Sequence, residues 1–271
     1  MNGPSESFLI EDDPRVSELL ERGWVQQPVE RHDELLLIRE LAATLAARHL
    51  GLAPPDDPEA FLDHIADHLP VTDLNPLRLA VFRGLNERAW LRPACYRLAE
   101  RALHALVGNE LAMQRRVNLS IQMPGDDSSL LPLHADSWSG DSPYELVLWI
   151  PLVDCQRTKS MFILPRAEQE RLVTDEVVTT AGSVEALFRV VEPAIHFLDV
   201  PFGEVLLFDQ NLLHGNRVNQ ETTTRWSLNC RFKGLFTPYA DKKLGEFFEP
   251  ITVRPMSRLG MTLRFPAKHD G

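Results

Sequence analysis

The sequence of 271 residues contains only three cysteines, and this scarcity excludes several stabilising frameworks. Cys95, Cys155 and Cys230 are odd in number and widely spaced, which fits neither a secreted disulfide scaffold nor a paired-cysteine zinc site. No stretch approaches the roughly 18 uncharged apolar residues of a membrane span, and the acidic first residues lack an apolar targeting segment. We therefore expect a cytoplasmic protein without a transmembrane segment.

Runs of basic residues are also missing, although the chain contains 28 Lys and Arg against 39 Asp and Glu, with a formal net charge of -11. Residues 1–110 contain 11 Arg and no Lys against 19 acidic residues. Because a phosphate backbone is bound by concentrated positive charge, we expect no nucleic-acid partner and a small-molecule substrate instead. The composition leaves the oligomeric state open.

Two kinds of hydrophobic periodicity divide the chain. From about residue 34 to residue 110 the apolar residues recur at helical spacing, and Gly51, Pro54 and Pro70 fall where helices would end. After residue 110 the period changes to two, which is typical of strands. The strands are expected in VNLSIQMP (117–124), YELVLWIPLVDC (144–155), EVLLF (204–208) and RWSLNCRF (225–232).

Short strands that follow a helical prefix predict a mainly β protein with helices (α+β), in which an antiparallel sandwich or barrel carries helices on its outside. We expect a single domain over residues 1–271, with a helical N-terminal layer at 1–110 and the strand-rich core at 111–271. Between about 166 and 200 the pattern loosens, and SVEALFRVVE predicts one short helix. This segment is interpreted as a lid-like insertion near the mouth of the barrel.

Most of the nine histidines lack a partner at metal-ligand spacing. His64 and His68 form an i, i+4 pair on an expected helix, but Ile65 stands where the zinc-protease motif has its catalytic Glu, so an exposed helix face is favoured. The remaining candidates are His134 in LPLHADSWSG and His214 in LFDQNLLHGN.

His134 and Asp136 are two residues apart, which on a strand would place both side chains on one face. His214 follows an expected strand much later in the sequence. Two imidazoles and one carboxylate on one face of an iron leave the opposite positions open for a co-substrate and O₂. This pattern predicts that His134, Asp136 and His214 form a catalytic metal site.

A second group of polar residues shares strand faces whose opposite sides are apolar. Arg225 and Ser227 alternate with apolar residues in RWSLNCRF, and a guanidinium with a hydroxyl two residues later can hold one carboxylate. Asn118, Ser120 and Gln122 share one face of VNLSIQMP. If these faces turn into a barrel, their side chains line a wet cavity.

These residues resemble the iron(II)/2-oxoglutarate-dependent dioxygenases, specifically the phytanoyl-CoA hydroxylase-like branch. The resemblance covers about residues 111–236 and rests on HAD at 134–136, GEVLLFDQNLLHGN at 203–216 and RWS at 225–227. It implies a double-stranded β-helix (jelly-roll, cupin-like) core, with Fe(II) bound by His134, Asp136 and His214. It also implies that Arg225 and Ser227 hold the distal carboxylate of 2-oxoglutarate, with Asn118 and Gln122 as further co-substrate candidates.

The reaction implied by the resemblance is hydroxylation of an unactivated C–H bond with Fe(II), 2-oxoglutarate and O₂, releasing succinate and CO₂. Desaturation or cyclisation would use the same oxidant, and the substrate is expected to be small and polar, with a sugar or sugar conjugate favoured. Members of this family carry a different segment where this chain has KSMFILPRAEQ (159–169). Their substrate-binding positions therefore cannot be assigned to residues of this chain. Candidates next to the metal-site segments are Trp138, Asp141, Tyr144, Arg157 and Asn216.

Two other functions are compatible with the same pattern. A cupin-like isomerase or epimerase of sugar nucleotides would keep the metal but use no redox chemistry. A non-catalytic carbohydrate-binding jelly roll would keep only the fold. A binding module has no need of all five residues of the presumed metal and carboxylate sites, which speaks against the last of these functions.

Overall fold

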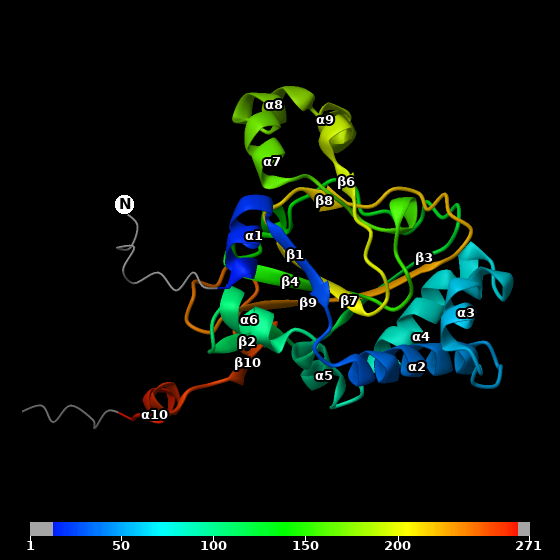
Figure 1. Cartoon of the computed structure of the whole chain (residues 1–271), viewed down its shortest axis with the longest axis horizontal. Coiled ribbons are helices and arrows are strands. Elements are labelled where there is room, and N and C mark those ends of the chain that lie inside the picture. The colour runs from blue at the N-terminus through cyan, green and yellow to red at the C-terminus, as the bar shows by residue number, and fades with distance from the viewer. Residues whose placement is uncertain (1–12, 265–271) are drawn as a thin grey trace, which may run out of the picture.

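The computed structural model describes residues 13–264, in which antiparallel sheets are combined with helices (Figure 1). The predicted mixture of helices and antiparallel strands is confirmed. No helix in this part of the chain is both long enough and apolar enough to cross a membrane. The helices are α1 (Pro14–Arg22), α2 (His32–His49), α3 (Pro58–Asp63), α4 (Leu74–Asn86), α5 (Leu91–Arg97), α6 (Glu100–Leu106), α7 (Arg166–Leu172), α8 (Asp175–Ala181), α9 (Val184–Val191) and α10 (Pro255–Thr262).

Local chemistry explains where the first helices begin and end. The Asp13 and Asp57 side chains accept hydrogen bonds from backbone amides in the first turns of α1 and α3, and each helix has a proline at its start. The helix expected through His64 and His68 instead ends at Asp63, and the two histidines flank a short 3₁₀ turn. Both are exposed, as expected, but they do not share one helix face.

Two antiparallel sheets form the centre of the molecule. The larger has the strand order β1-β7-β4-β9-β2-β10, with β3 also paired to β9, and the smaller has the order β6-β5-β8. The strands are β1 (Trp24–Pro28), β2 (Leu111–Gln114), β3 (Asn118–Gln122), β4 (Glu145–Pro151), β5 (Phe162–Ile163), β6 (His196–Phe197), β7 (Glu204–Asp209), β8 (His214–Gly215), β9 (Arg225–Gly234) and β10 (Phe248–Thr252).

The strand β9 has one apolar face and one polar face, which lie on opposite sides of the large sheet. Trp226, Leu228, Cys230 and Phe232 are fully buried in a core that also contains apolar residues of the helices. The Trp226 Nε1 donates a hydrogen bond to the carbonyl oxygen of Leu62, 2.8 Å away, which ties the sheet to the helical layer. The helices therefore brace one face of the sheet and leave the other face to the polar residues of the same strands.

The N-terminal layer differs from the expectation in one respect, because it is not wholly helical. Residues 24–28 form β1, which pairs antiparallel with β7 from Trp24 opposite Phe208 to Pro28 opposite Glu204. A five-residue strand that ends in proline carries little periodicity, and its place at the edge of the sheet depends on a partner about 180 residues away. The sequence pattern could not reveal that partner.

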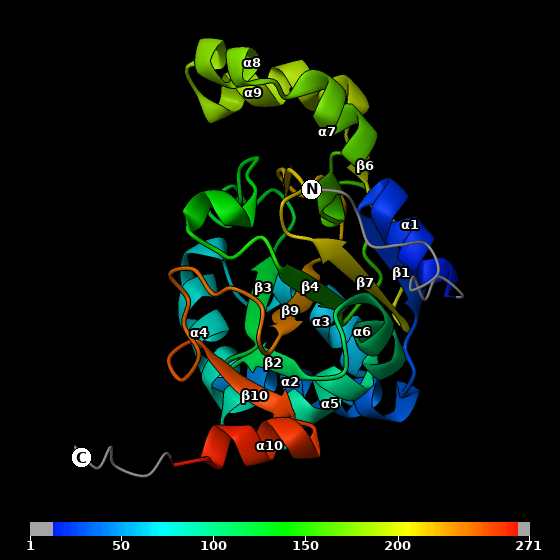
Figure 2. The ribbon, with the colours of Figure 1, turned by 90° about the vertical axis from the view of Figure 1, so that its left-hand side faces the viewer.

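The insertion near residues 166–200 contains three helices rather than the single one expected. Figure 2 shows α7, α8 and α9 standing above the sheets, at the end of the molecule where β6 lies. The expected helix in SVEALFRVVE is α9, and its Leu187, Phe188 and Val191 are buried against Phe162 of the small sheet and Leu213 beside β8. The insertion is thus anchored to the small sheet through an apolar cluster of its own.

Candidate active site

The backbone brings the two candidate histidines together. His134 and His214 form a β-bridge, with hydrogen bonds from His134 N to His214 O (3.0 Å) and from His214 N to His134 O (2.9 Å). Gly215 allows the segment before His134 to lie close to β8, because a Cβ there would lie 2.7 Å from the Leu131 carbonyl oxygen. The expected strand through HAD is absent from the structure: Asp136 instead begins a 3₁₀ turn that ends at Ser139.

The side chains of His134, Asp136 and His214 converge on one point. One ligand atom from each lies within 4.8 Å of the others, a spacing that can hold a metal ion. The Oδ1 of Asp136 is 3.4 Å from His134 Nε2 and 3.9 Å from His214 Nε2, and the two imidazole centroids are 4.3 Å apart. The structure therefore brings together the three residues predicted as metal ligands, although from a bridge and a turn.

Backbone carbonyl groups fix which nitrogen of each imidazole is free. His134 Nδ1 donates to Pro132 O (2.7 Å) and His214 Nδ1 donates to Leu212 O (2.8 Å), since a carbonyl oxygen can only accept. When each imidazole is neutral, its Nε2 atom thereby keeps a lone pair that is free for a metal. Such outer hydrogen bonds orient the imidazoles of metal sites.

The charge states of Asp136 and His214 suit a cation. Burial lowers the pKa of His134, but its hydrogen bond to Asp136 raises that pKa overall, so His134 must lose a proton to become a ligand. Burial opposes ionisation of Asp136, but the hydrogen bond from His134 and the charge of Arg231 hold the pKa of this carboxyl well below its usual range. Burial lowers the pKa of His214 to about 4, which leaves its imidazole neutral. An ionised carboxylate and a neutral imidazole are the forms that bind metal.

Arg231 positions the carboxylate of Asp136. Its Nη2 donates to Asp136 Oδ2 (2.7 Å), and its Nε donates to the Gln210 side chain (3.3 Å). The other carboxylate oxygen of Asp136, Oδ1, is the one that faces both histidines. Arg231 thus occupies one oxygen and leaves the other for a metal.

We expect Arg231→Met to weaken Fe(II) binding by roughly 10–100-fold, because the carboxylate loses the partner that orients it. Anaerobic equilibrium titration with Fe(II) measures this change. Arg231→Lys keeps the charge without the two-pronged geometry and should fall between wild type and Arg231→Met. Equal Fe(II) affinities in all three proteins would contradict the positioning role.

A cavity of about 450 Å³ adjoins the three candidate ligands. It lies on the polar side of the large sheet, as expected from the alternating strands. Its wall includes His134, Asp136, His214, Arg225, Arg231, Asn229, Asn118, Ser120, Asn216, Trp149, Phe208 and Arg78.

Arg225 lies in this wall and is almost completely buried. Its Nη2 donates to Ser120 Oγ (3.0 Å), and burial lowers its pKa to about 10. Neither Arg225 Nε nor the hydroxyl of Ser227 has a hydrogen-bond partner among residues 13–264, although both are buried. Ser227 pairs with Ser120 across β3 and β9, so these unpartnered atoms belong to one small region. A buried cation with unused donors is suited to an anionic ligand.

The two further co-substrate candidates differ in their positions. Asn118 lines the cavity, and its Nδ2 donates to the Asn229 side chain (2.9 Å). Gln122 is fully buried behind the wall, where its Nε2 donates to the Arg217 carbonyl oxygen (2.7 Å). A direct contact with a ligand in the cavity is therefore open to Asn118, whereas Gln122 supports the segment that follows His214.

Only one of the five substrate candidates lines the cavity. Asn216 does so, and its side chain also joins Leu131 N and Ser129 O. Asp141 is buried and forms ion pairs with Lys242 and Arg231. The other three are exposed away from the wall: Trp138 (52% exposed), Tyr144 (55%) and Arg157, whose guanidinium faces Glu221. Their role in substrate binding stays a prediction.

The sequence reasoning did not single out Arg231 or Arg78. Arg231 stands on the same face of β9 as Arg225, so the alternation of the strand could have identified it. Arg78 comes from α4, and nothing in the helical pattern distinguishes it from the other arginines of the layer. Only the folded chain places it at the cavity.

By fold, the chain is similar to a non-heme monooxygenase solved with nickel and to proteins solved with iron or with 2-oxoglutarate. The resemblance stated from the sequence is confirmed at this level, while the phytanoyl-CoA hydroxylase-like branch stays a prediction. No protein-family profile matches the chain, and no curated protein matches its sequence.

Three solved structures illustrate this similarity. EctD from S. alaskensis, with 2-oxoglutarate and 5-hydroxyectoine, has a TM-score of 0.55 at 18% identity, covering 85% of this chain and 80% of its own. HygX from Streptomyces hygroscopicus with iron has a TM-score of 0.51 at 14% identity (85% and 89% covered). The nickel complex of the non-heme monooxygenase ThoJ has a TM-score of 0.51 at 14% identity (89% and 85% covered).

Proposed function

We propose that this protein is an Fe(II)- and 2-oxoglutarate-dependent oxygenase that hydroxylates an unactivated C–H bond of a small polar molecule. The observation that carries the proposal is the shared cavity: a His-Asp-His cluster and a buried, unpaired guanidinium line the same wall. When bound, Fe(II) and 2-oxoglutarate would supply the oxidising chemistry: O₂ is consumed, the substrate is hydroxylated, and 2-oxoglutarate is converted to succinate and CO₂.

The residues of this chain would bind and orient these groups. His134, Asp136 and His214 would hold Fe(II) on one side and leave its other positions open. Arg225 and Ser227 would hold the distal carboxylate of 2-oxoglutarate, because their unpartnered donors are buried and aligned on one strand. Asn118 would contribute a further polar contact from β3.

The proposed architecture is a double-stranded β-helix formed by the two sheets, in one domain with the helical layer. The similarity in fold to the oxygenases above supports it. We also propose that α7–α9 act as a lid. The apolar cluster that contains α9 also includes Leu133, Ala135 and Leu213, which are the sequence neighbours of the candidate metal ligands. A movement of α9 would therefore shift the segments that position these ligands.

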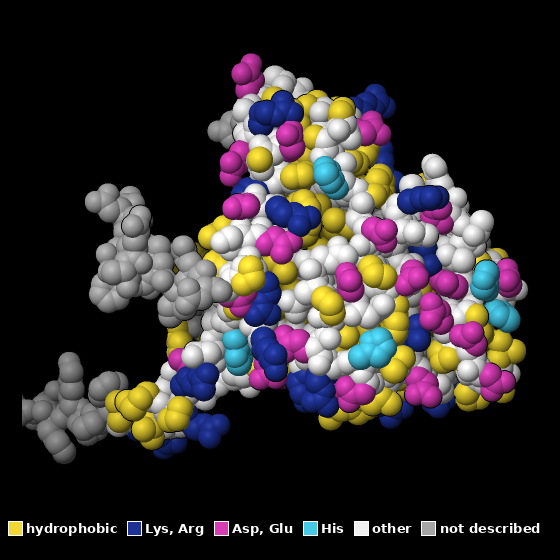
Figure 3. All heavy atoms as spheres, viewed as in Figure 1, with side chains coloured by type: hydrophobic (Ala, Val, Ile, Leu, Met, Phe, Trp, Pro, Cys, Tyr) yellow, Lys and Arg dark blue, Asp and Glu magenta, His cyan; other side chains and the backbone are white. Residues whose placement is uncertain are grey.

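A sugar or sugar conjugate is the proposed substrate class. Trp149 and Phe208 provide aromatic surface in the cavity wall, and Asn216 and Asn229 provide amide groups. This combination suits a ring with an apolar face and several hydroxyl groups. Figure 3 shows acidic and basic side chains interspersed on the face it displays, which fits a small-molecule rather than a nucleic-acid partner.

The test is the stoichiometry of co-substrate turnover over a panel of sugars, sugar conjugates and other small polar molecules. The proposal predicts that at least one of them stimulates O₂ consumption with equimolar release of succinate. A metal-dependent isomerase or epimerase would convert a sugar nucleotide without consuming O₂. Binding of carbohydrate with neither activity would instead identify a non-catalytic module.

A further inference from the structure

A second guanidinium, that of Arg78, lines the same cavity as Arg225 but comes from helix α4 of the N-terminal layer. Its Nη2 donates to the Ile121 carbonyl oxygen (3.2 Å) and to Ser129 Oγ (2.5 Å). Arg225 donates to the hydroxyl of Ser120, the residue before Ile121 in β3. The two guanidinium groups are therefore held at consecutive residues of one strand.

Neither guanidinium has a carboxylate partner. Within the described part of the chain, no ion pair involves Arg78 or Arg225, and their hydrogen bonds go to neutral oxygen atoms. The charge of Asp126 acts on both, but no hydrogen bond or ion pair joins it to either guanidinium: its Oδ1 accepts from the backbone and hydroxyl of Ser128, and its buried Oδ2 has no hydrogen-bond partner within residues 13–264.

The two positive charges also act on each other. Burial is the main cause that lowers the pKa of Arg225, and the charge of Arg78 lowers it further. Burial likewise lowers the pKa of Arg78. Two like charges in a partly desolvated wall are unfavourable until an anion joins them. The pair therefore has the chemistry of a carboxylate site with two cationic sides.

We propose that Arg78 and Arg225 together bind the distal carboxylate of the 2-oxo acid, so that the helical layer supplies a co-substrate-binding residue. This inference rests on the proposed function, because 2-oxoglutarate is its ligand. It has two consequences. The site favours a 2-oxo acid with a second carboxylate over a monocarboxylate, and a change in α4 alters co-substrate affinity without touching the metal.

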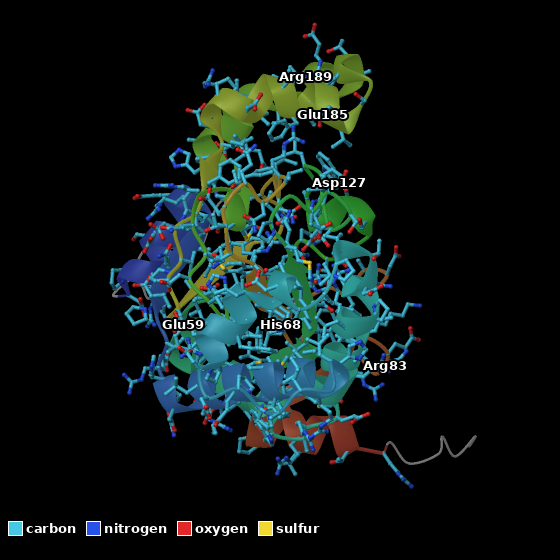
Figure 4. All side chains as sticks on the ribbon, turned by 90° about the vertical axis from the view of Figure 1, so that its right-hand side faces the viewer. Glu59, His68, Arg83, Asp127, Glu185 and Arg189 are labelled. Atoms are coloured by element: carbon cyan, nitrogen blue, oxygen red, sulfur yellow. The ribbon has the colours of Figure 1, made fainter. Side chains whose placement is uncertain are left out.

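The experiment compares Arg78→Met with wild type in the full chain under anaerobic conditions. Fe(II)-loaded protein is titrated with 2-oxoglutarate, and the visible charge-transfer band of the chelate reports binding. We expect the Kd of 2-oxoglutarate to rise about tenfold, as for the loss of one charge-assisted hydrogen bond, with Fe(II) affinity unchanged. Arg83→Met is the matched control, because Arg83 lies on the same helix but is exposed (Figure 4). It should bind like wild type.

A second 2-oxo acid separates carboxylate binding from a structural role. 2-Oxobutyrate lacks the distal carboxylate, so wild type and Arg78→Met should bind it with the same Kd. Arg78→Lys keeps a positive charge and replaces Arg78→Met in the experiment if Arg78→Met does not fold. It should lose affinity for 2-oxoglutarate but not for 2-oxobutyrate, and by less than the tenfold expected for Arg78→Met.

Three results have distinct meanings. An unchanged Kd of 2-oxoglutarate in folded Arg78→Met overturns the inference. Arg78 would then be free to bind an acidic group of the substrate that is to be oxidised. An equal loss for both 2-oxo acids also overturns it, since that result marks a structural role. Absence of the band in wild type would instead contradict the proposed function itself.

Discussion

Replacing His214 with alanine is expected to abolish stoichiometric Fe(II) binding and all succinate formation. His214 is one of three ligand candidates, its imidazole is buried, and its Nε2 is directed at the metal position by the hydrogen bond from Nδ1 to Leu212 O. Losing a ligand should cost more affinity than the roughly 10–100-fold typical of outer hydrogen-bond partners. Anaerobic Fe(II) titration and succinate assays measure both effects.

The matched control is His68→Ala. His68, labelled in Figure 4, is exposed in the helical layer and does not line the cavity. This variant should bind Fe(II) and release succinate like wild type. If His214→Ala retained one Fe(II) per chain at wild-type affinity, the assignment of the metal site would be wrong.

Replacing Arg225 with glutamine is expected to raise the Kd of 2-oxoglutarate by about 100-fold or more. Removing one partner of a buried ionic contact typically costs about 3–5 kcal/mol, and each 1.4 kcal/mol is a factor of ten. Fe(II) affinity should stay within about threefold of wild type, because no hydrogen bond or ion pair connects Arg225 to His134, Asp136 or His214 in the structure.

Thermal unfolding gives an independent measure of the same site. A ligand that binds only the folded protein raises the Tm, so 2-oxoglutarate with a redox-inert divalent metal should stabilise wild type. Arg225→Gln should lose this stabilisation, because it no longer binds the distal carboxylate at the same concentration. Wild-type affinity and an undiminished rise in Tm for Arg225→Gln would contradict the role proposed for Arg225.

The candidate site could be predicted from sequence where it depends on local spacing. The alternation of RWSLNCRF placed Arg225 and Ser227 on one face, and the structure puts the apolar face in the core. The four expected strand segments correspond to β3, β4, β7 and β9. The strand positions and the faces of their side chains depend on neighbouring residues, so the hydrophobic periodicity of the sequence is enough to predict them.

Features that depend on distant partners could not be predicted in this way. His134 and Asp136 were expected on a strand, but the chain there makes only a bridge to His214 and then turns. The metal candidates converge because distant backbone segments pair, not because two residues alternate. Arg78 reaches the cavity through packing of α4 beside β3, which no pattern within the helix specifies.

The most direct test of the central claim is an anaerobic titration of the purified wild-type protein with Fe(II) and 2-oxoglutarate together. We predict a visible charge-transfer band that saturates at one Fe(II) and one 2-oxoglutarate per chain, and that is lost in His214→Ala. Absence of the band at saturating concentrations of both would contradict the account of this cavity as a joint iron and 2-oxoglutarate site.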